Sequence, residues 1–336
     1  MKFSSLPISS RWAAFAAATL SLFLIWDQHY WWKLQDEYAF GFIVPLFVAY
    51  VLYERWPILA KGLIGDSETS AKALPADSGL ARAIAMGLQV IAVLMVVGGI
   101  LSFLLGVLYR AMEGQNLISS NSLAFGYANI LLGGAYLYAD KRANGEGIPL
   151  GERWHLAMLF LFPALIWMLS VPMFNAIHKM ISTFLMNKVA FVVYYAFDVL
   201  GYAVVREGSV LKLPLGDVGV EDACSGIRSL TACLFAGSFL GAVYFQQLWK
   251  KIFLVGTAML FAFINNIFRS LFLTAWAYAH GPEGLDDHVV LLGMDMGNVH
   301  DFTGWVVLGM TVVCLLILVK LFSIQLEYEI GGEESL

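Results

Sequence analysis

The sequence predicts an all-α polytopic membrane helix bundle of about eight transmembrane helices, with a small outer cap between spans five and six. Three observations predict this fold class. Hydrophobic residues make up 60% of the 336-residue chain and charged residues only 13%, whereas a soluble domain carries roughly 25% charged residues. Apolar runs close to the roughly 20 residues that cross a bilayer recur along the chain. Basic residues gather in alternate connections between these runs.

The apolar runs predict spans near residues 12–30, 38–53, 84–109, 118–138, 154–173, 227–245, 252–272 and 302–322. The first resembles a secretory signal peptide because Lys2 and Arg11 precede it. It continues into Asp27 and His29, however, without a small-x-small cleavage site. We therefore expect a retained helix, and we expect residues 1–336 to form a single membrane domain.

The basic residues predict the orientation. Nine of the 20 lysines and arginines fall in three connections, at 54–83, 139–153 and 246–251. With eight spans and the N-terminus inside, these connections, the N-terminal residues and Lys320 bring twelve basic residues to the cytoplasmic side. The short outer connections near 27–37, 110–117 and 280–301 hold only Lys33 and Arg110. This asymmetry predicts that 54–83 is a cytoplasmic loop and 323–336 a cytoplasmic tail in a cytoplasmic (inner) membrane.

The longest connection, 174–226, is predicted on the outer side. It begins with an amphipathic stretch from Phe174 to Tyr195, which is expected to lie in the interface or to re-enter the membrane. Residues 204–214 then alternate partly like a strand and contain turn residues. This segment is therefore expected to form a small outer hairpin or cap.

Composition argues against several functions. The net charge of −5 comes without a basic block, so nucleic-acid binding is not expected. The three cysteines form no C-x-x-C pair, and Cys233 and Cys314 fall in apolar runs as packing residues. A loop metal site is an alternative reading of His280, Asp286, Asp287, His288 and Asp295. Such loops are usually solvated and no helical i, i+4 histidine pair occurs, so neither a metal nor a cofactor is expected.

Three reactive side chains are predicted to reach one membrane depth. Cys224 lies just before the sixth span, Arg269 lies in the seventh, and His300 lies at the head of the eighth. At 1.5 Å per residue, Arg269 is about 26 Å from the inner start of its span, and His300 is about 30 Å from Lys320. Both therefore lie near the outer edge of a hydrocarbon core about 30 Å thick.

A thiol, an imidazole and a guanidinium suit acyl transfer. The thiolate is the nucleophile, and a cysteine pKa falls beside cationic groups or at a helix N-terminus. Cys224 is therefore the candidate nucleophile, His300 the general acid and base, and Arg269 the clamp for a carboxylate or an oxyanion. Candidates for substrate binding or support are Arg228, Asn265, Asn266 and Ser225. Singly, such residues are more often packing, snorkelling or solvated; together they favour a site.

The motifs around these residues resemble those of the exosortase/archaeosortase membrane transpeptidases. The shared elements are Ala-Cys-Ser-Gly-Ile-Arg-Ser-Leu at 223–230, Asn-Ile-Phe-Arg at 266–269 and His-Asp-Phe-Thr-Gly-Trp at 300–305. The resemblance is best over about 200–305, and the segment Tyr-Ala-Phe-Gly at 38–41 resembles the family's second-span motif. Phe40 stands where the family often has histidine, so no role of that histidine carries over.

The resemblance implies a Cys-His-Arg site that cleaves a C-terminal sorting tail from exported proteins and transfers the acyl group to an acceptor. Such tails combine a short proline-containing motif, a hydrophobic helix and a basic end. The implied partners are exported proteins with these tails and membrane lipid. The acceptor stays open between water, a lipid amine and a glycan, and the oligomeric state stays open too.

Two other functions compete with this one. A transporter or channel would place polar residues near mid-membrane on broken helices, and Asn265 and Asn266 are its main candidates. A non-catalytic scaffold or polysaccharide-export component would leave Cys224 buried and inert. Labelling of Cys224 by a thiol probe that depends on His300 separates catalysis from both.

Overall fold

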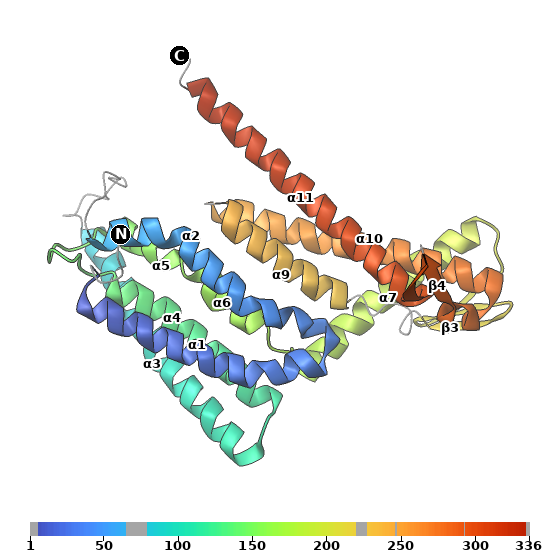
Figure 1. Cartoon of the computed structure of the whole chain (residues 1–336), viewed down its shortest axis with the longest axis horizontal. Coiled ribbons are helices and arrows are strands. Elements are labelled where there is room, and N and C mark those ends of the chain that lie inside the picture. Colours follow the sequence, from blue (N-terminus) through green and yellow to red (C-terminus); the bar gives the residue numbers. More distant parts are fainter. Residues whose placement is uncertain (1–5, 65–78, 220–226, 246, 292, 334–336) are drawn as a thin grey trace. The chain divides into compact units, whose positions relative to one another are not determined.

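The computed structural model confirms the predicted fold class. It describes residues 6–64, 79–219, 227–245, 247–291 and 293–333. Over these ranges the chain is mainly helical with two small sheets, and eight helices are long and apolar enough to cross a membrane (Figure 1). The chain divides into two compact units, Met1–Met173 and Phe174–Leu336.

The first unit contains α1 (Ile8–Leu34), η2 (Asp36–Ile43), α2 (Val44–Ile64), α3 (Gly79–Glu113), α4 (Leu117–Tyr138), α5 (Leu150–Met158) and α6 (Leu161–Leu169). The second contains α7 (Asn175–Val199), β1 (Val205–Glu207), β2 (Val210–Leu213), β3 (Gly216–Gly219), α9 (Ile227–Tyr244), α10 (Leu248–His280), η3 (Pro282–Asp286), β4 (His288–Leu291), β5 (Met294–Asn298) and α11 (Val299–Glu333).

Small residues bring α3 and α4 close together. A Cβ added to Gly126 would come 2.7 Å from the carbonyl oxygen of Gly99, and one added to Gly133 would come 2.7 Å from that of Ala92. Glycine lets two helix backbones approach in lipid, where packing rather than water drives association. Replacement of either glycine would push these helices apart.

A proline breaks the predicted span 154–173 into α5 and α6. Pro163 has no N–H to donate to the carbonyl of Leu159, four residues earlier. Arg55 of α2 donates to that carbonyl instead. A buried arginine thus satisfies the acceptor that the proline leaves open.

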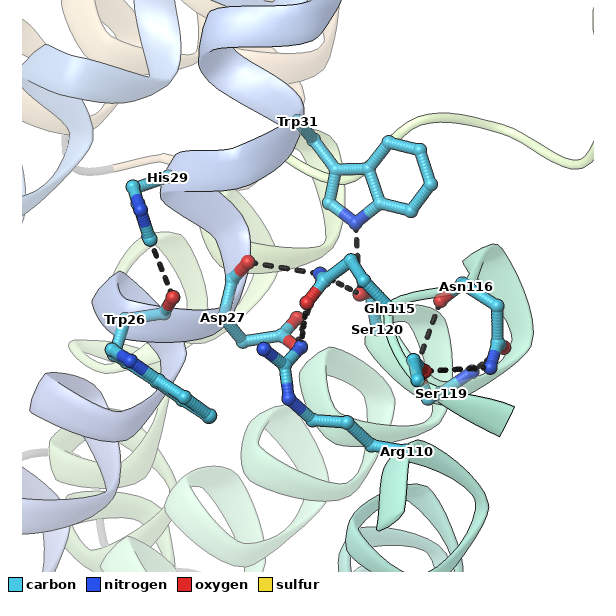
Figure 2. A network of polar contacts seen from close by, with 10 residues as sticks. Trp26, Asp27, His29, Trp31, Arg110, Gln115, Asn116, Ser119 and Ser120 are labelled. Carbon is cyan, nitrogen blue, oxygen red and sulfur yellow. Dashed lines mark hydrogen bonds and ion pairs between the residues drawn. The ribbon is translucent and has the colours of Figure 1, made fainter. Parts of the chain in front are cut away.

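A buried ion pair joins α1 to α3 (Figure 2). Asp27 is fully buried and pairs with Arg110 in the last turn of α3, whose guanidinium lies 4.2 Å from the ring centroid of Trp26. Gln115 contacts Arg110 and donates to the backbone carbonyl of Asp27 at 3.0 Å. These bonds join α1, α3 and the connection between α3 and α4. They also give the buried carboxylate of Asp27 the partners that a buried charge needs.

In the second unit, α7 packs against a three-stranded antiparallel sheet with the order β1-β2-β3. The predicted hairpin at 204–214 is present as β1 and β2, and Gly208 in its turn has φ +64°. The shared core contains Val189, Ala190, Val193, Phe197, Leu211, Leu213, Val218 and Ala277. Ala277 lies near the end of α10, so α7, the sheet and the C-terminal part of α10 form one cluster.

The helices differ from the predicted spans at several points. By length and composition, α7 is among the eight candidate spans and α4 is not, whereas the sequence predicts a span at 118–138 and a cap segment at 174–226. Serines and asparagines lower the hydropathy of α4; Asn121 and Asn129 donate to carbonyls four residues earlier.

The predicted loop 54–83 is partly helical, because α2 continues to Ile64 and α3 begins at Gly79. α11 likewise continues to Glu333.

Candidate active site

Arg269 and His300 come from two long helices of the second unit. Arg269 lies on α10, about 32 Å along the helix from Leu248 at 1.5 Å per residue. His300 lies in the first turn of α11. Asn298 precedes this turn, and its side chain accepts from the backbone N–H of Asp301 at 2.7 Å. The cap fixes where α11 begins and therefore where the imidazole lies.

The two side chains are in direct contact. Arg269 Nη2 lies 3.2 Å from His300 Nε2 and donates to the His300 carbonyl at 2.9 Å. Arg269 Nε donates to Thr303 Oγ1 at 3.5 Å, and the Thr303 hydroxyl donates to the same His300 carbonyl at 2.9 Å. The structure therefore brings together two of the three predicted catalytic residues.

This contact determines which nitrogen of His300 carries the proton. A guanidinium has only donors, so the lone pair of Nε2 must accept its N–H. The proton of a neutral imidazole is then on Nδ1, which lies 3.4 Å from Asp301 Oδ1. Asp301 accepts at one side of the ring while Arg269 donates at the other. In this arrangement Nε2 is the basic atom of His300.

Gly304 makes room for the guanidinium. A Cβ at this position would lie 3.5 Å from Arg269 Nη2 and 3.6 Å from its Cζ. A side chain longer than a methyl group would therefore meet the guanidinium.

A polar cavity of about 270 Å³ opens beside His300. Its lining residues are Asp217, Val218, Gly219, Pro282, Leu285, Asp286, Asn298 and His300. The cavity thus lies between the end of β3, η3 and the start of α11. A small polar group that enters the cavity would therefore meet His300.

The remaining predicted residues are placed as follows. Cys224 and Ser225 lie outside the described residues, in the segment 220–226 that joins β3 to α9. Arg228 is exposed in the first turn of α9. Asn266 is buried, and Asn265 donates to Thr311 Oγ1 of α11 at 2.6 Å. Asn265 therefore ties α10 to α11 away from the cavity.

Several residues of the site were missed in the sequence. Asp301, Thr303 and Gly304 follow His300 directly in the motif His-Asp-Phe-Thr-Gly-Trp, so the motif itself was the signal. Asp217 and Asp286 reach the cavity from segments distant in sequence, which no local pattern reveals.

The hairpin β4–β5 next to the site contains an exposed contact between a histidine and a carboxylate. His288 Nδ1 lies 2.8 Å from Asp295 Oδ2. The backbone N–H of Gly297 and the His288 side chain together hold the pKa of Asp295 below its usual range. His280 stacks on Trp276 with ring centroids 4.3 Å apart. In the described ranges no group of three or more His, Cys, Asp or Glu side chains is placed to hold a metal ion.

The comparisons with known proteins agree with the motifs. A family described as transmembrane exosortase (Exosortase_EpsH) matches residues 31–317, which include α10 and the first half of α11. No curated protein and no solved structure matches the chain. Because the family match covers nearly the whole sequence, the chain belongs to the transmembrane exosortases, a family of membrane cysteine transpeptidases.

Proposed function

We propose that this protein cleaves a C-terminal sorting tail from exported proteins at the outer face of the membrane and transfers the new carboxyl end to an acceptor. Cys224 is the nucleophile, His300 the general acid and base, and Arg269 the clamp. The contact of 3.2 Å between Arg269 and His300 carries the proposal. It joins a base and an oxyanion donor beside a cavity that a substrate can enter.

The reaction has two acyl-transfer steps. In the first, the Cys224 thiol gives its proton to His300 Nε2 while Sγ attacks the scissile carbonyl carbon. The C–N bond breaks, and the amine of the released tail takes the proton back from the imidazolium. In the second, the acceptor attacks the thioester, gives its proton through His300 and restores the thiol.

Arg269 makes the first proton transfer depend on bound substrate. In the structure its Nη2 donates to Nε2, the atom that has to accept the thiol proton. The guanidinium must therefore turn toward a substrate oxygen before the base is available. A carbonyl oxygen that becomes negative in the transition state is a stronger acceptor than a neutral imidazole, so substrate binding favours this turn.

Asp301 and Thr303 position the two catalytic groups. Asp301 faces Nδ1 of His300 at 3.4 Å, which keeps the basic lone pair on Nε2. Thr303 is 8% exposed and links Arg269 Nε to the His300 carbonyl. Neither side chain needs to touch the substrate for these roles.

The cap supports an outer position for the site. The sheet has open edges and the charged residues Glu207, Lys212 and Asp217, so it cannot lie in hydrocarbon. It packs on Val189 to Phe197 of α7, which places that half of the helix outside the lipid core. The rest of α7, residues 175–188, is about 21 Å long and too short to cross a core of about 30 Å. We therefore propose that α4 crosses the membrane and α7 belongs to the cap.

The principal alternative is a transporter, for which Asn265 and Asn266 are the main candidate polar residues. The contacts of Asn265 argue against this role. Asn265 uses its amide N–H to bind Thr311 of α11 and does not line the cavity beside His300. It serves as an interhelical contact, which is common in membrane bundles.

The test is mass spectrometry of a co-expressed protein that carries a sorting tail. The unaltered enzyme should yield a shortened protein with a new C-terminus and show the mass of the acceptor. Cys224→Ala should abolish processing, whereas the matched variants Cys233→Ala and Cys314→Ala should process normally, since both cysteines lie within helices away from the cavity. Tail cleavage by Cys224→Ala would reject the mechanism.

A further inference from the structure

An apolar cavity of about 560 Å³ lies inside the first unit. Helices α1, α2, α3, α4 and α5 supply most of its wall, and its volume is within the range of roughly 300–1,000 Å³ typical of ligand sites. It involves none of the residues of the candidate active site. The proposed reaction does not use this cavity.

The cavity runs along α1 and α4, which are antiparallel. Ser21 contacts Tyr127 at 2.6 Å between their hydroxyls, and Trp31 donates to Ser120 at 2.9 Å. The wall on α1 extends from Ser10 to Leu20, about 15 Å at 1.5 Å per residue. This equals one half of a hydrocarbon core about 30 Å thick, which is the depth that one acyl chain occupies.

One end of the cavity is lined by a polar residue, and two basic residues follow lining residues closely in sequence. Ser10 lines it, is 9% exposed, and its hydroxyl is buried without a hydrogen-bond partner within the described ranges. The next residue, Arg11, has a buried Nε that also lacks a partner there. Lys141 is exposed just after Ala139, which lines the same end. Buried polar groups are normally paired, so these atoms indicate an absent polar partner.

We propose that this cavity binds one glycerophospholipid of the surrounding membrane. One acyl chain lies along α1 between Ser10 and Leu20, the Ser10 hydroxyl turns to donate to the ester carbonyl, and Arg11 and Lys141 face the phosphate. The apolar wall, the length of one leaflet, the unpaired Ser10 hydroxyl and the neighbouring basic residues fit this class of molecule together. The lipid then acts as a filler between α1, α2, α4 and α5.

Gly134 offers a direct test. It lines the cavity, and a Cβ added there meets nothing within 4 Å. Gly134→Leu therefore fills the cavity without a backbone clash. Gly98 is the matched control, because it is also helical, a Cβ there also meets nothing, and it does not line the cavity. Both variants add the same side chain and the same gain in helix propensity.

Native mass spectrometry of the full chain, released from bilayer nanodiscs of defined phospholipids, measures the retained lipid. The unaltered protein and Gly98→Leu should each retain one phospholipid, and Gly134→Leu should lose at least tenfold in occupancy. Ser10→Ala should lose roughly threefold to tenfold, as expected for one hydrogen bond. Equal retention in Gly134→Leu, or none in the unaltered protein, would overturn the proposal.

Two further arms keep the test decisive. If Gly134→Leu does not fold, Ala17→Leu fills the same cavity from α1. A phospholipid with a photoreactive acyl chain should label Ala17 and Leu131 in the unaltered protein but not in the filled variant. Retention of a co-expressed sorting tail in place of phospholipid, lost in Gly134→Leu, would assign the cavity to the substrate and reject the lipid.

Discussion

At the scale of single residues, Arg269 makes contacts that an ammonium group cannot reproduce. Its Nη2 reaches both Nε2 and the carbonyl of His300, while Nε reaches Thr303. Arg269→Lys keeps the charge but loses this planar fork. We expect turnover of a tailed substrate to fall by about 10²-fold or more. Arg206→Lys is the control, since Arg206 lies in β1 and stacks on Phe191. Full activity of Arg269→Lys would show that charge alone suffices.

Asp301 is predicted to act through His300. Asp301→Asn keeps the shape but weakens the acceptor at Nδ1, so the tautomer with a free Nε2 is less favoured. We expect kcat to fall by about 10-fold to 100-fold with little change in KM, and Asp301→Glu to recover part of the loss. Steady-state kinetics across pH on a tailed peptide measures both constants. Asp295→Asn, an exposed carboxylate of the β4–β5 hairpin, should leave them unchanged. A loss confined to KM would mean that Asp301 binds substrate instead.

At the scale of elements, the ion pair between Asp27 and Arg110 ties α1 to α3. Arg110→Leu leaves a fully buried carboxylate without its cation, and one oxygen of Asp27 already lacks a partner within the described ranges. We expect a loss of about 3–5 kcal/mol in the free energy of unfolding. The double variant Asp27→Asn with Arg110→Leu should recover much of this loss, because the buried charge is gone. Thermal unfolding in detergent measures both, and a neutral Arg110→Leu would contradict the pairing.

The sequence predicts elements well where one apolar run forms one helix. The spans near 84–109 and 227–245 correspond to α3 and α9 because hydropathy alone determines them. The sequence predicts elements less well where contacts between distant segments determine where a helix breaks or ends. The break between α5 and α6 depends on Pro163, but its cost is reduced by Arg55, a residue far away in sequence. Hydropathy also cannot show that the sheet packs on α7.

In the candidate site, too, the sequence predicts some features, whereas others depend on tertiary contacts. Arg269 and His300 could be placed together by counting residues along two antiparallel helices, and the structure brings them into contact. The direction of that contact, with Arg269 donating to the basic nitrogen, needs side-chain positions. The cavity needs them too, because Asp217 and Asp286 come from separate segments that only the folded chain joins.

At the scale of the whole molecule, the side of the membrane on which each connection lies depends on which helices cross, because each crossing reverses the side. The composition counts α7 and leaves out α4, whereas packing of the charged sheet on α7 argues for the opposite assignment. With α4 crossing and α7 in the cap, the twelve basic residues counted above remain on one side. Charge distribution and sheet packing therefore favour the same topology.

This topology predicts opposite accessibility for two exposed positions. Glu207 lies in β1 of the cap, and Asn144 lies in the connection between α4 and α5. In a variant whose native cysteines are replaced by serine, a membrane-impermeant maleimide added to intact cells should label Glu207→Cys and not Asn144→Cys. Both should react after the membrane is opened, which controls for folding and expression. If both positions react in intact cells, the two loops share the outer side and α7 crosses in place of α4, which rejects this topology but keeps Cys224 outside. If Glu207→Cys does not react in intact cells, Cys224 is on the wrong face for an exported substrate.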